Sequence, residues 1–397
     1  MTTTRLPQVP LFEIRGSPRT MGRMLGEQAG DLIRDMLYTY RSFMQQASGF
    51  SWAEAVRESH KYLPYAQAAY PQYVEEIVGI AEGAGVSFQD AWLLNCYEGV
   101  AEDQKLMACT SIAANDDVTA DGHVYLGHNE DWIGGDSQHV YLVRATPDDG
   151  PAFLSVSYGP MLCNLGFNAA GIAVGINSVY PTDVRVGVPQ VVLSRAVLAA
   201  ERLSDALRAC LHDRRASGYN HLLADRSGEI FSVESSATRH DVLYAHEGWL
   251  AHTNHYLSER LQAIEQRFVY ASSNVRLRRA QRLLRRQTGA LSREGLQTIL
   301  RDHVSYPDSI CKHEVMTDAP HDRSRTLISM IMDLTELTMW VAPGPPCCGE
   351  YVPHRLESAA APPKSDAAVP ARQPQTGSEG ELRFWSDATR AVLGQSG

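Results

Sequence analysis

The stretch ACTSIAA at residues 108–114 follows a mostly helical region and opens an apolar run that carries hydroxyl groups. It places Cys109 directly after the small residue Ala108, so that a thiol stands at the head of an expected strand. Such a thiol can attack the carbonyl of its own preceding peptide bond, and Ala108 leaves room for the tetrahedral intermediate. The attack would replace the peptide bond by a thioester between Ala108 and the Cys109 sulfur. Hydrolysis of this thioester would make Cys109 a new N-terminus. Its α-amine, with a reference pKa of about 7.7–8.0, can then act as general base for its own thiol.

A cysteine before Thr-Ser is weak evidence by itself, because a buried structural cysteine is the commoner case. The second informative stretch is DGHVYLGHNEDW at residues 121–132. A turn at Asp121-Gly122 predicts a hairpin that joins the strand of Cys109 to a second strand. The far end of that strand returns beside Cys109, so we expect Asp131 near the thiol and the new amine.

Together these stretches resemble the acyl-coenzyme A:isopenicillin N acyltransferase family and, more distantly, choloylglycine hydrolases, acid ceramidase and N-acylethanolamine acid amidase. The shared pattern is Cys-Thr, here residues 109–110, followed by Gly-x-Asn-x-Asp and an aromatic residue, here GHNEDW at 127–132. NHLLAD at 220–225 and TNH at 253–255 also match. The resemblance implies an α+β fold of the N-terminal-nucleophile (Ntn) hydrolase type. That fold is a four-layer αββα sandwich of two antiparallel sheets with flanking helices.

The resemblance also implies roles for the site residues. The chain would cut itself between Ala108 and Cys109, and Cys109 would become the nucleophile. Asp131 would hold and orient the α-amine through a charge-assisted contact. Asn254 would donate its side-chain amide to the oxyanion, a contact whose loss typically costs ~10²–10³ in rate. Asn177 matches a second oxyanion-site asparagine.

A family arginine maps onto Arg323 or Arg325, and the register favours Arg323. His128 stands where the hydrolase relatives carry arginine, and it is the alternative base if the α-amine does not serve. Glu130 replaces an apolar or aromatic residue, which alters the pocket wall or adds an acidic contact. Trp132 is expected in the core or in the wall of the pocket.

These assignments predict an amidohydrolase or acyltransferase that forms a thioester with the acyl group of an N-acyl amino acid, a peptide or a β-lactam-like amide. Water and an amine both stay open as acyl acceptors. No cofactor is expected, although an acyl-coenzyme A or another acyl thioester is an open choice of co-substrate. One alternative is a non-catalytic relative that keeps the fold for binding, against which the intact nucleophile and its partners speak.

A second alternative is a metal-dependent amidohydrolase that uses His252 and His255 with His128 and Asp131. A spacing of three on an extended or turn segment is poor zinc geometry, so no metal is expected. Cys347 and Cys348 lack a second Cys/His pair at zinc spacing and are interpreted as structural.

Composition limits the partners and the compartment. The chain has 397 residues, 44% of them apolar, and a formal net charge of −10. This acidity argues against nucleic acid or an anionic membrane as a partner, and leaves a small-molecule amide or acyl thioester. No stretch approaches the ~18 apolar residues of a membrane helix, and residues 1–10 carry no secretory signal. Seven cysteines, an odd number, favour reduced thiols in a cytoplasm. The oligomeric state stays open.

We expect three regions along the chain. Residues 1–108 are mostly helical and form an α chain after cleavage, and residues 109–356 form the catalytic core as a β chain that stays associated with it. Residues 357–397, rich in Ala, Pro and Ser, are expected to be a disordered tail. The more specific expectations are a helix from Met21 through Ile33, a capping box at Ser51–Glu54, one helix over 191–210, hairpins over 219–233 and 326–341, and an arginine-rich helix at 276–286 that turns a solvated face outward.

Overall fold

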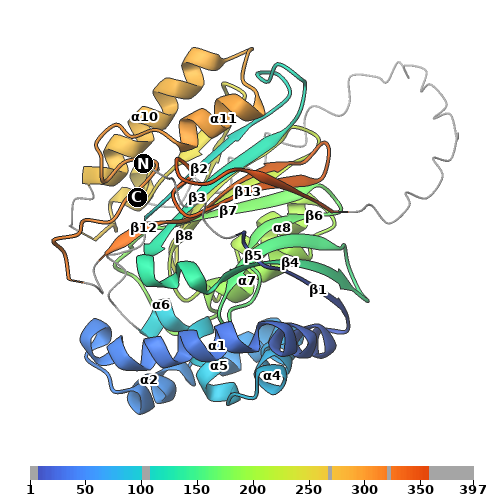
Figure 1. Ribbon diagram of the computed structural model, residues 1–397, viewed down its shortest axis with the longest axis vertical. Coiled ribbons are helices and arrows are strands. Elements are labelled where there is room, and N and C mark those ends of the chain that lie inside the picture. Colours follow the sequence, from blue (N-terminus) through green and yellow to red (C-terminus); the bar gives the residue numbers. More distant parts are fainter. Residues whose placement is uncertain (1–7, 101–107, 267–270, 320–322, 357–397) are drawn as a thin grey trace, which may run out of the picture. The chain divides into compact units, whose positions relative to one another are not determined.

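Two β-sheets lie face to face at the centre of the molecule, and helices cover both outer faces (Figure 1). The structure is a computed structural model that describes residues 8–100, 108–266, 271–319 and 323–356. All of these residues belong to one compact unit. The expected tail at 357–397 lies outside the described residues.

The first sheet has eight strands in the order β1-β4-β5-β6-β7-β8-β9-β10. Only the pair β1–β4 is parallel among its neighbours, and the others are antiparallel. Its strands are β1 (Leu11–Gly16), β4 (Val140–Pro147), β5 (Phe153–Tyr158), β6 (Leu165–Asn168), β7 (Ile172–Ser178), β8 (Tyr219–Asp225), β9 (Ile230–Ser235) and β10 (His240–Tyr244).

The second sheet has six antiparallel strands in the order β11-β2-β3-β12-β13-β14. Its strands are β11 (Trp249–His252), β2 (Ala108–Ala114), β3 (Tyr125–Ile133), β12 (Ser324–Asp333), β13 (Thr338–Pro343) and β14 (Val352–Arg355). The strands β2 and β3 face β7 of the first sheet.

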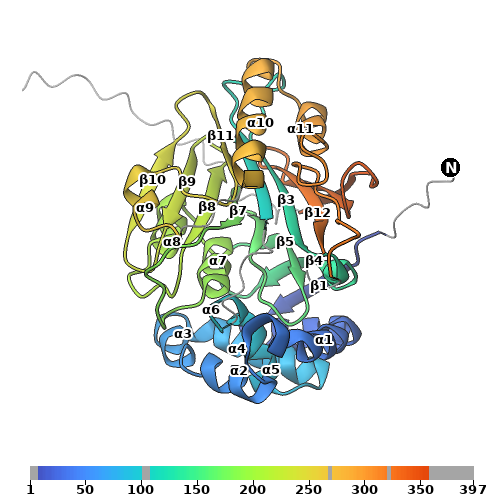
Figure 2. The same cartoon turned by 90° about the vertical axis from the view of Figure 1, so that its left-hand side faces the viewer.

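Two pairs of helices complete the layers (Figure 2). The helices α10 (Ala271–Gln287) and α11 (Arg293–Leu300) pack on the outer face of the six-stranded sheet. The helices α7 (Gln190–Leu198) and α8 (Leu203–Cys210) pack on the eight-stranded sheet, and the short α9 (Glu259–Gln262) contacts β10. The order helix, sheet, sheet, helix confirms the predicted α+β class and its four layers.

The N-terminal helices form a separate layer at one end of the sheets. They are α1 (Pro18–Ser48), α2 (Trp52–Ser59), α3 (Leu63–Ala69), α4 (Pro71–Ala84), α5 (Phe88–Asn95) and α6 (Tyr97–Val100). The helices α1 and α4 pack backbone against backbone, because a Cβ added at Gly22 or Gly26 would collide with carbonyl groups of α4. The capping box of Ser51 and Glu54 is confirmed at the start of α2.

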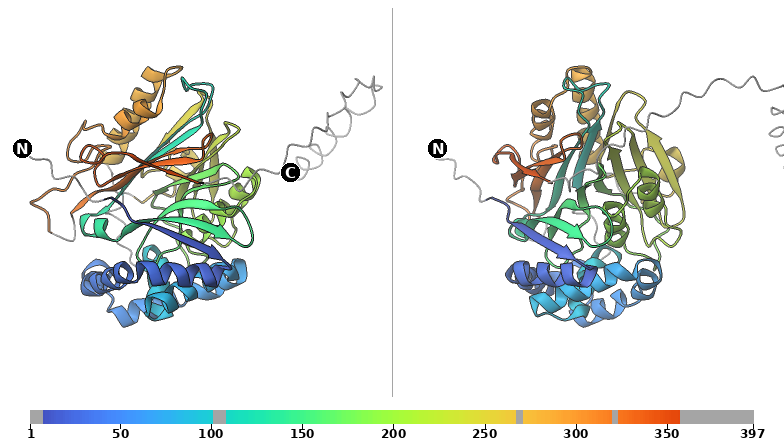
Figure 3. Two further views of the ribbon diagram at one scale, coloured as in Figure 1. Left: turned by 45° about the vertical axis from the view of Figure 1, so that its right-hand side comes forward. Right: turned by 90° about the vertical axis from the view of Figure 1, so that its right-hand side faces the viewer.

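This layer is tied to the sheets by strand pairing and by a buried ion pair. Strand β1 adds to the edge of the eight-stranded sheet beside β4 (Figure 3). Arg195 of α7 and Glu76 of α4 form an ion pair of 3.0 Å, and both side chains are almost fully buried. Breaking such a buried pair typically costs ~3–5 kcal/mol, so the N-terminal segment is held firmly against the core.

The single helix expected over 191–210 is wrong, because the structure has α7 and α8 with a break between them. The side chain of Asn168 donates to the carbonyl groups of Leu198 and Ala200, which lie at that break. A distant side chain therefore satisfies carbonyls that a continuous helix would have used itself. The hairpins over 219–233 and 326–341 are confirmed by β8–β9 and β12–β13. Among the described helices, none is both long and apolar enough to cross a membrane.

Candidate active site

The hairpin of β2 and β3 sets the position of Cys109. The two strands pair with Cys109 opposite Glu130 and Ala108 opposite Asp131. Between them the chain turns with Gly122 at φ 71°, a left-handed conformation that glycine adopts without strain. The expectation that the far end of the second strand returns beside Cys109 is confirmed.

The thiol of Cys109 lies in a buried polar cluster. It is 2% exposed and donates to Oε2 of Glu130 at 3.5 Å. The same carboxylate oxygen contacts Nε2 of His128 at 2.9 Å, and Nδ1 of His128 contacts the hydroxyl of Ser111 at 2.8 Å. Burial raises the pKa of the Cys109 thiol well above its ordinary value, and the charges of Glu130 and Asp131 raise it further. The thiol is therefore neutral, and it would need a proton acceptor to become a nucleophile.

The side chains of Asn254 and Arg276 hold the backbone of Cys109. This part of β2 lies beyond the residues that pair with β11. The Cys109 N–H donates to Oδ1 of Asn254 at 2.8 Å. Arg276 of α10 donates to the Cys109 carbonyl at 2.6 Å, to the Thr110 hydroxyl at 3.1 Å and to the same Oδ1 of Asn254 at 2.9 Å. Arg276 is only 1% exposed. These bonds fix the main chain on both sides of the Cys109 side chain.

Asp131 lies directly across the hairpin from Ala108. One carboxylate oxygen, Oδ1, accepts from the hydroxyl of Thr326 at 2.6 Å. The other oxygen, Oδ2, is buried without a hydrogen-bond partner in the part of the chain that the structure describes. Burial raises the pKa of Asp131 to about 7, against the opposing effects of Arg276, Thr326 and Lys312. The site therefore holds an acceptor that lacks a donor, next to the bond that would be cut.

Asn177 on β7 offers the complementary feature, a donor that lacks an acceptor. Its Oδ1 accepts from Asn220 at 3.0 Å, and its Nδ2 is buried and unpartnered within the described residues. A Cβ added at Gly175, two residues earlier on the same face of the strand, would meet Ser111 and His128. This face of β7 therefore looks onto β2 and β3, where Cys109 lies.

Asn254 stands beside Cys109 as expected, but its amide is already engaged. Its Nδ2 donates to the carbonyl of Ser178 at 3.1 Å. In the uncut chain Asn254 therefore positions the Cys109 backbone with its oxygen. Donation of its N–H to an oxyanion would require the bond to Ser178 to break.

A hollow opens beside the thiol on the side of the eight-stranded sheet. It is small, with a volume of about 20 Å³, and it is lined by Cys109, Glu130, Tyr158, Asn164, Leu165, Ile176, Ser178, Gln190 and Tyr219. A neighbouring pocket shares Tyr158, Asn164 and Gln190 with it and is also lined by residues of the N-terminal helices, including Tyr62 and Asn95. The N-terminal segment thus forms part of the walls around the candidate site.

The two arginines that the sequence offered for the site, Arg323 and Arg325, lie away from Cys109. Arg323 donates to the carbonyls of Met316 and Asp318, and Arg325 contacts Ser137 and Glu314. Neither arginine has a described contact with Cys109, and the arginine found there is Arg276.

The expectation of a solvated face at 276–286 is wrong for Arg276, although Arg282, Arg285 and Arg286 are exposed. Nothing in the arginine-rich pattern distinguishes the buried Arg276 from the exposed arginines of the same helix.

Trp132 lies in the core, away from the hollow. Its Nε1 donates to the hydroxyl of Tyr40 on α1 at 2.9 Å. The histidines of the alternative zinc site are held in other contacts, since His252 bonds to Glu234 and His255 to Ser273. A second group of cysteines and histidines, near Cys347, escaped notice in the sequence because its members come from separate segments.

Comparison with known proteins identifies the family of the chain. The family model of acyl-coenzyme A:6-aminopenicillanic acid acyl-transferase matches residues 118–346. That range includes Asp131, Asn254 and Arg276 and begins after Cys109.

Two curated relatives have an activity in their names. The chain is 24% identical over 270 residues to the acyl-coenzyme A:6-aminopenicillanic-acid-acyltransferase 40 kDa form of Emericella nidulans, covering 66% of this chain and 72% of that one. It is 27% identical over 232 residues to the beta-alanyl-dopamine/carcinine hydrolase of Drosophila melanogaster, covering 51% and 57%. An uncharacterized protein of Archaeoglobus fulgidus is 27% identical over 256 residues, covering 55% and 41%. The chain thus spans about half the length of the last two relatives.

Solved structures of similar proteins include the conjugated bile acid hydrolase from Clostridium perfringens, with a TM-score of 0.44, 12% identity and coverage of 59% of this chain and 89% of that one. Penicillin V acylase from Agrobacterium tumefaciens has a TM-score of 0.42, 15% identity and coverage of 59% and 83%.

Proposed function

The chain belongs to the acyl-coenzyme A:6-aminopenicillanic acid acyl-transferase family, and from this membership we propose that it cuts itself between Ala108 and Cys109 and then uses the Cys109 thiol to cleave or transfer an amide-linked acyl group. The observation that carries the proposal is the buried, unpartnered Oδ2 of Asp131 across the hairpin from that bond. An α-ammonium formed at Cys109 would supply the missing donor and a compensating charge.

Self-cleavage requires that the thiol lose its proton to a neighbour. Glu130 is the acceptor in contact with the thiol, and His128 stabilises its carboxylate. The thiolate attacks the carbonyl carbon of Ala108, the carbon–nitrogen bond breaks, and the Cys109 nitrogen takes up the proton. Water then hydrolyses the thioester, which frees the carboxylate of Ala108 and leaves Cys109 with a free thiol and a free α-amine.

In the mature enzyme the α-amine takes over as the base. It accepts the thiol proton, and the thiolate attacks the acyl carbon of the amide substrate. The tetrahedral intermediate expels the amine, which leaves with the proton held by the α-ammonium. Attack by water or by a second amine on the Cys109 thioester then releases the acid or the new amide. An acyl thioester such as acyl-coenzyme A could load Cys109 by thiol–thioester exchange.

We assign the oxyanion donor first to Nδ2 of Asn177. This N–H is buried and unpartnered within the described residues, so its donation to a developing negative charge breaks no existing bond. Loss of one such donor typically lowers turnover ~10²–10³-fold. Asn177→Ala tests this assignment, and Asn254→Ala should instead impair self-cleavage, because Asn254 accepts from the Cys109 N–H.

The substrate would bind in the hollow beside the thiol, against the hydroxyl and amide groups of Tyr158, Asn164, Gln190 and Tyr219. We propose that the two chains stay associated after cleavage, because strand β1 and the buried pair Arg195–Glu76 join the N-terminal segment to the core. We also propose a cytoplasmic setting, since all seven cysteines are free.

Intact-protein mass spectrometry tests the proposal. The wild-type chain should give fragments that begin at Met1 and Cys109, and Cys109→Ala should give one uncut, inactive chain. Cys210→Ala is the matched control, because Cys210 is also fully buried but lies on α8. Incubation with N-acyl amino acids and acyl thioesters should leave an acyl adduct on the Cys109 fragment. A wild-type chain that stays uncut and still hydrolyses amides would exclude the α-amine as base.

A metal-dependent hydrolase is the second candidate, because one ligand atom each from Cys109, His128 and Glu130 lie within 4.8 Å of one another. Three protein ligands with an open position are typical of catalytic zinc. That enzyme would bind a metal ion that Cys109→Ala loses. The thiol mechanism instead predicts that iodoacetamide abolishes turnover and that a Cys109→Ala chain keeps the metal content of wild type.

A further inference from the structure

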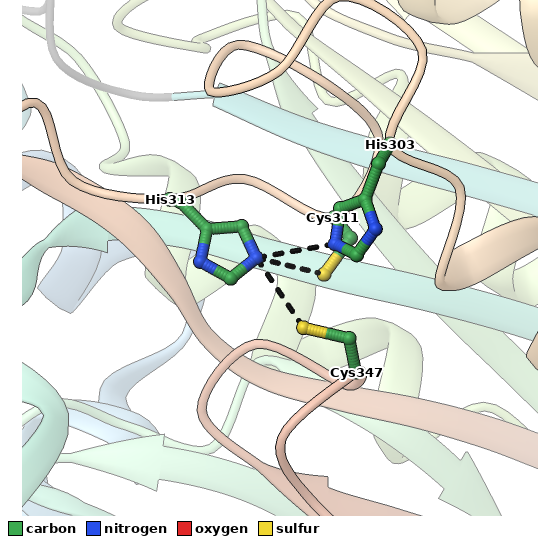
Figure 4. A group of neighbouring side chains, drawn as sticks. All are labelled: His303, Cys311, His313 and Cys347. Carbon is green, nitrogen blue, oxygen red and sulfur yellow. Dashed lines mark hydrogen bonds between the residues drawn. The ribbon is translucent and has the colours of Figure 1, made fainter. Parts of the chain in front are cut away.

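A second cluster of ligand-type side chains lies outside the candidate active site (Figure 4). His303, Cys311 and His313 come from the segment between α11 and β12, and Cys347 comes from the segment after β13. Figure 4 shows the two imidazoles and the two sulfur atoms turned toward a common point. Cys311 is buried, His313 is half-buried, and His303 and Cys347 are exposed.

The distances within the cluster fit a tetrahedral metal site. Nε2 of His313 lies 3.2 Å from Nε2 of His303, 3.5 Å from Sγ of Cys311 and 3.3 Å from Sγ of Cys347. One ligand atom from each of the four residues lies within 4.8 Å of all the others. With zinc–nitrogen and zinc–sulfur bonds of about 2.0–2.3 Å, the edges of a tetrahedron measure about 3.3–3.8 Å.

Hydrogen bonding alone does not account for this arrangement. Nε2 of a neutral histidine carries either one proton or one lone pair, yet Nε2 of His313 has three close polar neighbours. A cation at the common point would use the lone pairs of both imidazoles and of both thiolates at once. Two thiolates would also neutralise the charge of a divalent ion.

We infer that His303, Cys311, His313 and Cys347 bind a zinc ion with a structural role. Four protein ligands close the coordination sphere and leave no position for a substrate, as in structural rather than catalytic zinc sites. The site would join two segments that are separated in the chain by β12 and β13.

The segment that carries the cluster also supports the candidate active site. The N–H of Lys312, between the ligands Cys311 and His313, donates to the hydroxyl of Thr326 at 3.0 Å. That hydroxyl donates to Oδ1 of Asp131 at 2.6 Å. The zinc ion would therefore hold the segment that orients Asp131, and its loss would loosen that carboxylate without touching the thiol.

The metal content of the full chain tests this inference. The protein is purified under reducing conditions, exposed to zinc, freed of loosely bound metal and analysed by elemental mass spectrometry. Wild type should hold about one zinc ion per chain, and Cys347→Ser and His303→Ala should hold below about a tenth of that amount. Cys348→Ser is the matched control, because it alters the adjacent exposed thiol and should keep the ion. Circular dichroism establishes that each variant is folded.

Replacement of zinc by cobalt gives a second readout that does not depend on activity. Wild type should show thiolate-to-cobalt charge transfer and the intense visible bands of tetrahedral cobalt, and Cys347→Ser should weaken both. The inference is overturned if wild type takes up no zinc, or if Cys347→Ser and His303→Ala bind as much as wild type. It is also overturned if Cys311 and Cys347 are joined by a disulfide in the chain purified under reducing conditions. Zinc that is lost only in Cys109→Ala would place the ion at the other cluster and overturn it as well.

Discussion

The two faces of strand β3 carry different parts of the candidate site. On the face toward the eight-stranded sheet, Glu130 contacts the thiol and His128 supports Glu130. On the face toward α10 and α11, Asp131 bonds to Thr326, and Asn129 donates to backbone carbonyls of Leu300 and Ile310. The separation follows from the alternation of side chains along a strand.

The comparison teaches that the direct contacts of the thiol and the anchoring of the backbone come from opposite faces of one strand, although the charges of Asp131 and Arg276 also act on the pKa of the thiol. The inner face, toward the eight-stranded sheet, carries Glu130, which contacts the thiol and whose charge raises the pKa of the thiol beyond the effect of burial. The outer face, toward α10 and α11, holds the main chain with Arg276 and carries the Asp131 oxygen that has no hydrogen-bond partner among the described residues. Substitutions of the inner-face residues that contact the thiol or Glu130 should therefore alter reactivity at nearly constant stability, and substitutions on the outer face should alter stability as well.

The largest effect is expected for Arg276→Gln. It removes three hydrogen bonds to buried acceptors and takes away a buried positive charge that lowers the pKa of Asp131. We expect a loss of ~3–5 kcal/mol in the free energy of unfolding and no self-cleavage, measured by chemical denaturation and mass spectrometry.

Arg323→Gln is the control for this variant, since Arg323 is the arginine that the sequence favoured. Among the described contacts, its side chain bonds only to loop carbonyls. It should change stability by no more than about 0.5 kcal/mol and leave cleavage intact. A result in which Arg323→Gln blocks cleavage and Arg276→Gln does not would reverse the assignment of the outer face.

Glu130→Gln should slow self-cleavage by roughly 10²–10⁴-fold, because the side chain that accepts the thiol proton becomes neutral. Stability should change little, since the amide keeps the shape and the contacts of the carboxylate. A time course of cleavage in cell-free translation measures the rate. His128→Gln should have a smaller effect, because His128 acts through Glu130. Normal cleavage in Glu130→Gln would remove the inner face from the mechanism.

The pH dependence of stability tests the outer face alone. The pKa of Asp131 is raised by burial to about 7 in the uncut fold, against about 3.9 in an unfolded chain. The folded chain therefore binds a proton that the unfolded chain has released, and this contribution to stability is lost as the pH rises from about 4 through about 7. We expect uncut Cys109→Ala to lose on the order of 3 kcal/mol over that range.

The double variant Cys109→Ala with Asp131→Asn should lack this part of the pH dependence, as followed by calorimetry. The cut wild-type enzyme should lack it too, because the new α-ammonium favours the ionised carboxylate. An equal slope in all of these proteins would show that another group titrates.

The hairpin and its partners could be predicted because their signals are local. The turn at Asp121-Gly122 and the alternating strands bring Asp131 back to Ala108 whatever the rest of the chain does. The same alternation in sequence places Glu130, rather than Asp131, on the side of the thiol. The catalytic roles of these residues remain predictions, because a sequence pattern indicates which residues lie close together but not which reaction they carry out.

The parts that could not be predicted depend on contacts between distant segments. Arg276 has the same sequence surroundings as the exposed arginines of α10, and only the packing of that helix on β2 buries it. The break between α7 and α8 contains neither glycine nor proline, and the side chain of Asn168 stabilises it from another strand. Cys347 lies beside its neighbours because β12 and β13, which separate it from them in the chain, pair as a hairpin.

The smallest effect is expected for Trp132→Phe. This variant tests whether every residue on the inner face of β3 affects the reactivity of the site. Trp132 lies on the same face as Glu130, but its indole donates to Tyr40, whose hydroxyl bonds to Asp136. Phenylalanine keeps most of the apolar contact and removes one buried hydrogen bond, so stability should fall by about 1 kcal/mol. Cleavage and turnover should match those of wild type. If turnover falls as stability is retained, the indole reaches the substrate, and the reactive part of this face extends beyond Glu130 toward the N-terminal helices.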